Sequence, residues 1–162
     1  AARRSAWFEP YHAALSDDLA RLRTLPPVVV LYDCHSIRSV VPRLFPGELP
    51  HFNIGPNEGL SCDPVLPARI EAIADATGLT RVTNGRFKGG GITRRYGRPA
   101  DGVHAVQMEL GCRGYMDEPD PVGEAVWPTP WDPDRAQAMR LALTDILAAC
   151  KAFAEAAPET AR

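Results

Sequence analysis

The sequence predicts an α/β fold, in which helices pack against a sheet that contains parallel strands. The first observation behind this prediction is the order of the expected elements, which runs helix, strand, helix, strand, strand, helix. The second is the uninterrupted apolar run from Val28 to Tyr32, which is typical of a strand covered on both faces. We therefore expect residues 1–162 to form a single domain.

The chain opens with an expected amphipathic helix, which Pro10 bends or restarts. The Pro26-Pro27 pair is a strong breaker, so the helix is expected to end near it. The strand from Val28 to Tyr32 follows and is predicted to end at Asp33-Cys34-His35. The apolar positions of the helix are Tyr11, Leu15, Leu19 and Leu22.

A segment rich in Pro, Gly and Asn runs from Ser36 to Asp63 without a sustained period, and a connection of that length is usually functional. We interpret it as a loop of the functional site.

Asp63-Pro64 and Asp132-Pro133 share one helix-start pattern, a capping side chain followed by proline at the first helical position. The expected buried positions are Leu66, Ile70 and Ile73 in the first helix, which ends at Gly78, and Met139, Leu143, Ile146, Leu147, Cys150 and Phe153 in the second.

Two strands are expected between these helices, from Leu79 to Thr83 and from Val103 to Leu110. The connection between them, Asn84 to Gly102, holds six glycines and five basic residues, with Asp101 as its acidic residue. Gly111 to Trp131 is expected to be irregular because it contains four prolines.

Composition narrows the function classes. With 18 Lys and Arg against 20 Asp and Glu the formal charge is −2, so neither nucleic acid nor an anionic membrane is an expected partner. No apolar run is long enough to cross a bilayer. The four cysteines are widely spaced, which favours a reducing, cytoplasmic setting. The chain begins without Met and inside an expected helix, so we expect it to be a piece of something longer.

His35 follows the predicted parallel strand, and ligand sites of open α/β sheets lie at the carboxyl ends of the strands. It is therefore a candidate metal ligand or catalytic group, and the alternative is a loop histidine that hydrogen-bonds to its neighbours. Asp33 is then either its partner or a helix-capping acid.

Glu109 is a carboxylate near the end of an otherwise apolar strand, where it can serve as a general base. A salt bridge to an arginine of the preceding loop is the structural alternative, and spacing alone favours it. Strand alternation places His104 on the opposite face, where we interpret it as structural.

The basic loop from Asn84 to Gly102 has the spacing of neither a Walker loop nor a dinucleotide fingerprint. Its arginines suit a small carboxylate, which a guanidinium can bind through two hydrogen bonds. A solvated, flexible loop is the alternative, and a nucleic-acid contact fits the slightly acidic chain less well.

Six sequence blocks, taken in order, resemble the N-formylglutamate amidohydrolase family over nearly the whole chain, and correspond to the larger, C-terminal part of that family's proteins. The blocks are W-x-x-P-Y-H-A-A-L (Trp7 to Leu15), D-C-H-S-I-R-S (Asp33 to Ser39), P-R-L-F-P-G-E-L-P (Pro42 to Pro50), N-G-R-F-K-G-G (Asn84 to Gly90), I-T-R-R-Y-G-R-P (Ile92 to Pro99) and G-V-H-A-V-Q-M-E-L (Gly102 to Leu110).

The resemblance implies a three-layer α/β/α sandwich similar to the zinc carboxypeptidases, without its N-terminal part. It also implies zinc-dependent hydrolysis of N-formyl-L-glutamate to formate and glutamate in histidine degradation. By this resemblance His35 is the zinc ligand and Glu109 is the carboxylate that activates water. The residues that fall in motifs expected to face the acidic small-molecule substrate are Arg38, Asn84, Arg86, Thr93 and Arg94.

The chain departs from the family pattern at several positions. Cys34 replaces a small residue, His51 an acid, and Arg95 a residue that is commonly histidine, while Gly111 to Gly114 is unusual. The remaining zinc ligands, a histidine and an acid, and a further arginine motif belong to an N-terminal region with no counterpart here. Two alternatives therefore stay open: a related amidohydrolase acting on another N-acyl amino acid, and a non-catalytic domain that binds an acidic metabolite or a partner chain.

Overall fold

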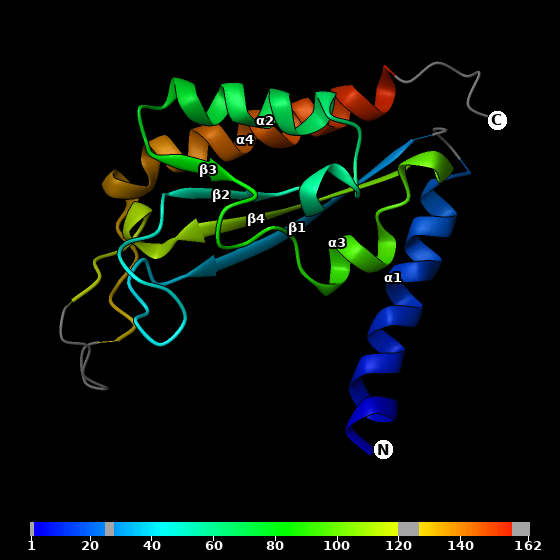
Figure 1. The fold of residues 1–162 in the computed structure, drawn as a ribbon, viewed down its shortest axis with the longest axis horizontal. Helices are drawn as coiled ribbons and strands as arrows, with labels where there is room; N and C mark the ends of the chain where they lie inside the picture. Colours follow the sequence, from blue (N-terminus) through cyan, green and yellow to red (C-terminus); the bar gives the residue numbers. More distant parts are fainter. Residues whose placement is uncertain (1, 25–27, 120–126, 157–162) are drawn as a thin grey trace.

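A four-stranded mixed sheet lies at the centre of the computed structural model, which describes residues 2–24, 28–119 and 127–156 (Figure 1). The strand order is β1-β4-β2-β3, in which β1 pairs with β4 in parallel, β4 with β2 antiparallel, and β2 with β3 in parallel. β1 therefore lies at one edge of the sheet. The strands are β1 (Val29–Ile37), β2 (Phe52–Gly55), β3 (Arg81–Thr83) and β4 (Val103–Gly111).

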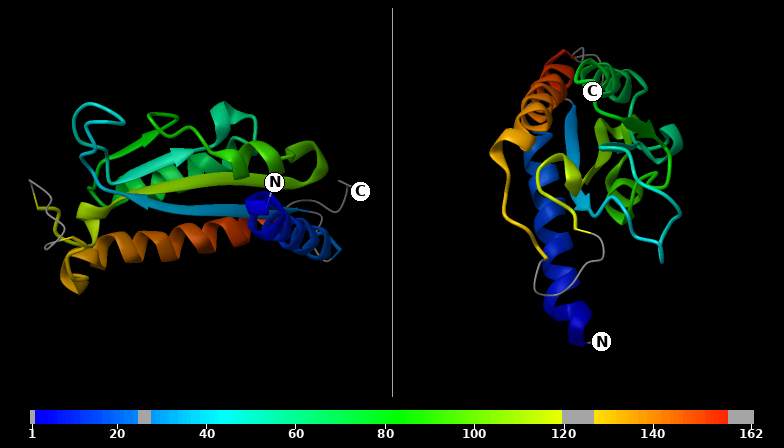
Figure 2. Two further views of the ribbon diagram at one scale, coloured as in Figure 1. Left: turned by 90° about the horizontal axis from the view of Figure 1, so that it is seen from below. Right: turned by 90° about the vertical axis from the view of Figure 1, so that its left-hand side faces the viewer.

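Helices lie on both faces of this sheet (Figure 2). The second and fourth helices in chain order pack against each other on one face, whereas the other face meets the short third helix and the C-terminal part of the first. None of the described helices is long and apolar enough to cross a membrane. The helices are α1 (Glu9–Leu22), α2 (Val65–Ala76), α3 (Gly91–Tyr96) and α4 (Pro133–Glu155), and a π-helical turn (Arg4–Phe8) leads into α1.

Strand alternation divides β4 between the two faces. Val106 and Met108 belong to the main core, which is filled from β2, α2 and α4, whereas Val103 belongs to a smaller cluster with Leu19 of α1 and Val29 of β1. The run predicted from Val28 to Tyr32 is confirmed as a strand covered on both faces, because its residues contact these two clusters in alternation. The predicted α/β class is thereby confirmed.

Both Asp-Pro helix starts are confirmed. Asp63 Oδ1 accepts a hydrogen bond from the Val65 amide at 2.8 Å, and Asp132 Oδ1 accepts from the amides of Asp134 and Arg135 at 3.1 and 3.0 Å. These bonds satisfy amides that the first helical turn leaves without a partner, which is why the capping pattern predicts the starts well.

Three predicted boundaries are wrong. β1 continues through His35 to Ile37, because its pairing with β4 holds the backbone extended as far as Gly111. The segment predicted as a loop from Ser36 to Asp63 contains β2, whose four residues are too few to show alternation. The basic loop contains α3, which begins directly after glycines that predict no helix.

Three residues predicted on buried stripes are exposed. Leu147 of α4 is 51% exposed, and Tyr11 and Leu22 of α1 are 56% and 37% exposed. Figure 1 shows the reason for Tyr11: the N-terminal half of α1 projects away from the sheet and has no sheet surface to cover. α1 ends at Leu22, a few residues before the predicted breaker Pro26-Pro27, which itself lies outside the described residues. Part of the irregular stretch before Trp131 also lies outside them.

Candidate active site

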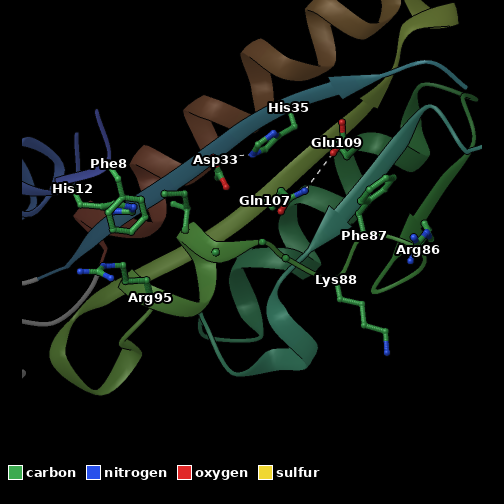
Figure 3. A pocket seen from close by; sticks show the side chains of 14 residues that line it. Phe8, His12, Asp33, His35, Arg86, Phe87, Lys88, Arg95, Gln107 and Glu109 are labelled. Atoms are coloured by element: carbon green, nitrogen blue, oxygen red, sulfur yellow. Dashed lines mark hydrogen bonds and ion pairs between the residues drawn. The ribbon is translucent and has the colours of Figure 1, made fainter. Parts of the chain in front are cut away.

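A polar pocket of about 570 Å³ lies along one face of β1 and β4, towards the carboxyl ends of both strands (Figure 3). Parallel pairing sets Asp33 opposite Gln107 and His35 opposite Glu109. Because side chains two residues apart in a strand share a face, all four line the same pocket. The sequence places His35 and Glu109 each at a strand end, and the register brings them together.

His35 has one close polar neighbour on its own strand. Its Nε2 atom lies 3.1 Å from Asp33 Oδ1, while Asp33 Oδ2 is buried without a hydrogen-bond partner. A carboxylate beside one ring nitrogen is the arrangement that orients a metal-binding histidine through the other nitrogen. Asp33 is thus a partner of His35, and the helix-capping alternative is wrong because Asp33 lies inside β1.

Glu109 is 6% exposed, and the hydrogen-bond partner of its carboxylate among the described residues is Gln107, whose Nε2 donates to Oε2 at 3.4 Å. Burial raises the pKa of Glu109, and the opposing effects of His35 and the Gln107 hydrogen bond are smaller. In the described part of the chain no arginine or lysine pairs with this carboxylate, so the salt bridge favoured by spacing is not formed. A carboxylate with a raised pKa is better suited to accept a proton.

His104 is structural, as strand alternation predicts. It lies on the opposite face of β4, where its Nδ1 accepts a hydrogen bond from the Asp63 amide at 2.9 Å and its ring meets Phe153 edge-on at 4.9 Å. Desolvation lowers the pKa of His104, which keeps the ring neutral as the acceptor requires.

The five predicted substrate-contacting residues do not gather in one place. Arg86 lines the pocket, and buried Thr93 packs behind its glycine-rich wall. The side chain of Arg94 donates to the Gly89 carbonyl, and Asn84 Oδ1 accepts from the Glu58 amide. Neither Arg94 nor Asn84 lines the pocket.

Arg38 also lies outside the pocket, although it shares a sequence block with His35. Its Nη2 donates to the Pro119 carbonyl at 3.0 Å, and its guanidinium lies 5.1 Å from the centre of the Trp127 ring. Arg38 therefore holds the segment after β4 instead of facing the site.

The glycine-rich wall depends on close backbone approach at Gly89. Its φ of +121° is disfavoured for other residues, and a Cβ atom there would lie 2.6 Å from Thr93 Oγ1. A Cβ at Gly55 of β2 would in turn lie 2.6 Å from the Gly89 amide nitrogen. The glycines thus let this loop lie directly against β2 and shape one side of the pocket.

Sequence reasoning missed several lining residues. Strand alternation with Glu109 could have identified Gln107, and proximity to Arg86 could have suggested Phe87 and Lys88. No sequence signal places α1 at the pocket, so its contributions were not predicted. The further missed residues that line the pocket are Phe8, His12 and Arg95.

The pocket does not by itself complete a metal site. His35, Asp33 and Glu109 have the donor types that zinc accepts. Among the described residues, however, no group of three His, Cys, Asp or Glu side chains is arranged to hold a metal ion. The described residues therefore offer donor types that a metal accepts, without a complete set of ligands.

The chain is an α/β protein with a mixed sheet and helices on both faces. A pocket near the carboxyl ends of two parallel strands holds an imidazole, a partly exposed aspartate and a buried glutamate, as in enzymes of this class. The chain belongs to the N-formylglutamate amidohydrolase family, whose family model matches residues 1–116. This finding confirms the family resemblance of the six sequence blocks.

Two N-formylglutamate deformylases are similar to this chain. The protein of Pseudomonas aeruginosa is 50% identical over 139 residues, which is 85% of this chain and 50% of the relative. The protein of Pseudomonas putida is 53% identical over 115 residues, which is 70% of this chain and 43% of the relative. The chain thus spans about half the length of the curated relatives it matches.

The fold is also similar to a solved structure. The crystal structure of N-formylglutamate amidohydrolase from Ralstonia eutropha JMP134 matches with a TM-score of 0.73 at 24% sequence identity. The match covers 94% of this chain and 52% of that one. At this identity the likeness shows a shared fold.

Proposed function

We propose that this chain carries one half of the active site of a cytoplasmic zinc-dependent amidohydrolase, which hydrolyses N-formyl-L-glutamate to formate and L-glutamate in histidine degradation. The observation that carries the proposal is the pairing of His35 with Glu109 across β1 and β4 in one pocket. Family membership and the names of the two Pseudomonas relatives support the substrate.

In this proposal the residues of the chain have separate roles. Glu109, buried and with a raised pKa, accepts the proton of the attacking water and returns it to the departing amine. Gln107 holds the carboxylate in place through its hydrogen bond to Oε2. Arg86, exposed at the pocket rim, binds a carboxylate of the substrate, with Thr93 supporting the wall behind it. Asn84, Arg94 and Arg38 hold backbone positions around the pocket.

His35 is the proposed zinc ligand, oriented by Asp33. Zinc in such a site acidifies bound water and acts as a Lewis acid. The other ligands, and the rest of a carboxypeptidase-like sandwich, are proposed to lie in the part of the relatives that has no counterpart in these 162 residues.

A second candidate function is the binding of an acidic metabolite without hydrolysis. It is favoured by one observation, the absence of a three-ligand cluster among the described residues. A related amidohydrolase acting on another N-acyl amino acid differs only in the acyl or amino-acid group, which a panel of substrates distinguishes.

The test compares the isolated chain with a chimera, in which this chain replaces the matching segment of the Pseudomonas aeruginosa relative. Zinc content and release of the free amino acid from N-formyl-L-glutamate, N-acetyl-L-glutamate and N-formyl-L-aspartate are measured for both. We expect the chimera to hold zinc and to prefer N-formyl-L-glutamate, while the isolated chain binds zinc weakly and is inactive.

The variant His35→Ala should abolish zinc retention and turnover in the chimera, because it removes one of three protein ligands. The control is His51→Ala, which removes an imidazole that lies outside the pocket and interacts with Thr80. Zinc content at the level of the unmodified chimera in His35→Ala would exclude His35 as a ligand.

A further inference from the structure

The pocket has a second end that the proposed chemistry does not use. Figure 3 shows Phe8, His12 and Arg95 at the opposite end from Glu109, with Asp33 and His35 between. Phe8 and His12 come from the helical segment at the start of the chain, and Arg95 comes from α3. Segments far apart in the sequence thus build this end together.

Aromatic rings surround the Arg95 guanidinium. Its Cζ atom lies 5.9 Å from the centre of the Phe8 ring and 5.7 Å from that of Tyr96. Phe8 in turn contacts His12 with ring centres 4.0 Å apart. Stacking on rings restrains a guanidinium while leaving its N–H donors free at its edge.

Arg95 has no acidic partner among the residues that the structure describes, whereas two other cations near the pocket are paired. Arg4, which also lies over Phe8, pairs with Glu9 at 2.9 Å, and Lys88 at the pocket rim pairs with Glu58 at 2.6 Å. Within the described chain neither an ion pair nor a hydrogen bond of the Arg95 side chain is formed. Its positive charge is therefore available to a ligand.

His12 is fixed in place and does not compete for that ligand as a second cation. Its Nδ1 lies 2.6 Å from the Tyr96 hydroxyl, which also reaches the His12 carbonyl at 3.2 Å. Desolvation and the charges of Arg95 and Arg4 lower the pKa of His12, which favours a neutral ring. Arg95 is thus the fixed cation of this end.

The two ends of the pocket differ in charge. Figure 3 shows Arg86 and Lys88 on the Glu109 side, so that end carries charges of both signs, while Asp33 lies between the two ends. The Phe8, His12 and Arg95 end has a guanidinium and no carboxylate. A carboxylate that binds at this end meets a cation without a lining carboxylate beside it.

We propose that Phe8, His12 and Arg95 form a carboxylate-capture subsite, where Arg95 binds a carboxylate of a small dicarboxylate on its way to or from the reacting end. A guanidinium can bind a carboxylate through two parallel hydrogen bonds, and the rings restrain its orientation. The subsite rests on the proposed function for the identity of its ligand, but binding there requires neither zinc nor hydrolysis.

The test uses the full 162-residue chain without added metal, titrated with glutarate and, separately, with L-glutamate. NMR follows the Arg95 side-chain Nε–H and the His12 ring, and 1,5-pentanediol serves as the uncharged control ligand. We expect glutarate to shift both signals in a saturable manner and pentanediol to shift neither.

Single-residue variants test whether Arg95 supplies the positive charge that binds glutarate. Arg95→Gln should weaken glutarate binding by about three- to tenfold, the effect of one charge-assisted hydrogen-bonded contact at an exposed site. The matched control is Arg98→Gln, which removes the same charge from the same loop, where the guanidinium donates to the Arg94 and Gly97 carbonyls. Arg95→Lys, which keeps the charge but not the planar donor pair, should be intermediate.

Equal affinity in Arg95→Gln and the unmodified chain, or equal losses in Arg95→Gln and Arg98→Gln, would overturn the subsite. Amide spectra of each variant identify any loss of fold, and Arg95→Lys keeps the proposal testable if Arg95→Gln unfolds.

In an active chimera, Arg95→Gln should raise KM for N-formyl-L-glutamate at constant kcat, because it removes a binding contact and no group that takes part in the chemistry. An unchanged KM would count against the subsite and would leave the proposed function unaffected. Glutarate binding at Arg95 beside an inactive chimera supports the subsite and refutes the proposed function.

Discussion

Replacing Glu109 with Gln tests whether this carboxylate is used for chemistry or for stability, because the two roles predict opposite signs. Glu109 is 6% exposed, and the Gln107 amide reaches it at 3.4 Å, longer than the usual N–H···O distance of about 2.9 Å. The charge is thus buried with little compensation. The amide of Gln has nearly the same size and no charge, so the substitution removes the cost of burying the carboxylate.

The expected magnitude follows from this environment. Removing a poorly compensated buried charge should raise the free energy of unfolding at pH 7 by about 0.5–2 kcal/mol. If Glu109 were instead one half of a buried salt bridge, the same change would lower it by about 3–5 kcal/mol. The two hypotheses therefore differ by more than the error of a denaturation experiment.

The assay is urea unfolding of the metal-free chain in the presence of EDTA, which removes any contribution of bound zinc. Glu118→Gln is the contrasting control. Glu118 accepts hydrogen bonds from the Ser39 amide and hydroxyl at 2.9 to 3.1 Å, so neutralising it should lower the free energy of unfolding. Turnover of the Glu109→Gln chimera should fall by several orders of magnitude. Destabilisation by more than about 1 kcal/mol, or a turnover loss below about tenfold, would refute the reasoning.

Two further predictions concern the opposite face of the sheet. Stability should fall as the pH drops below about 6.5, because the folded chain holds His104 neutral with a lowered pKa while the unfolded chain protonates it. Urea midpoints from pH 7.5 to 5 check this, and His104→Gln should flatten that part of the profile; an equal slope in both chains would assign the pH dependence to other groups. Ile146→Ala should cost about 2–5 kcal/mol because Ile146 is fully buried, whereas Leu147→Ala, at a side chain 51% exposed, should cost far less. Similar losses in the two alanine variants would contradict the observed orientation of α4.

Local sequence patterns were sufficient to predict most of the helices and strands. The Asp-Pro starts of α2 and α4 were predictable because a capping side chain acts within its own turn, as the Asp63 bond to Val65 shows. β4 was predictable because apolar residues fill most of the stretch from Val103 to Leu110. β2 and α3 were not, because four and six residues carry too little pattern and depend on neighbouring strands for their conformation.

The sequence by itself determined the family and the α/β class, and it offered His35 and Glu109 as candidates for chemistry, since motifs and strand ends are local features. Only the tertiary structure decided that these two residues face each other, because the register of β1 on β4 is a non-local property. It also decided which arginines meet the pocket: Arg86 and Arg95 line it, while Arg94 turns to a backbone carbonyl. Adjacent residues of one helix point in different directions. The sequence alone does not show which of these directions leads to the pocket.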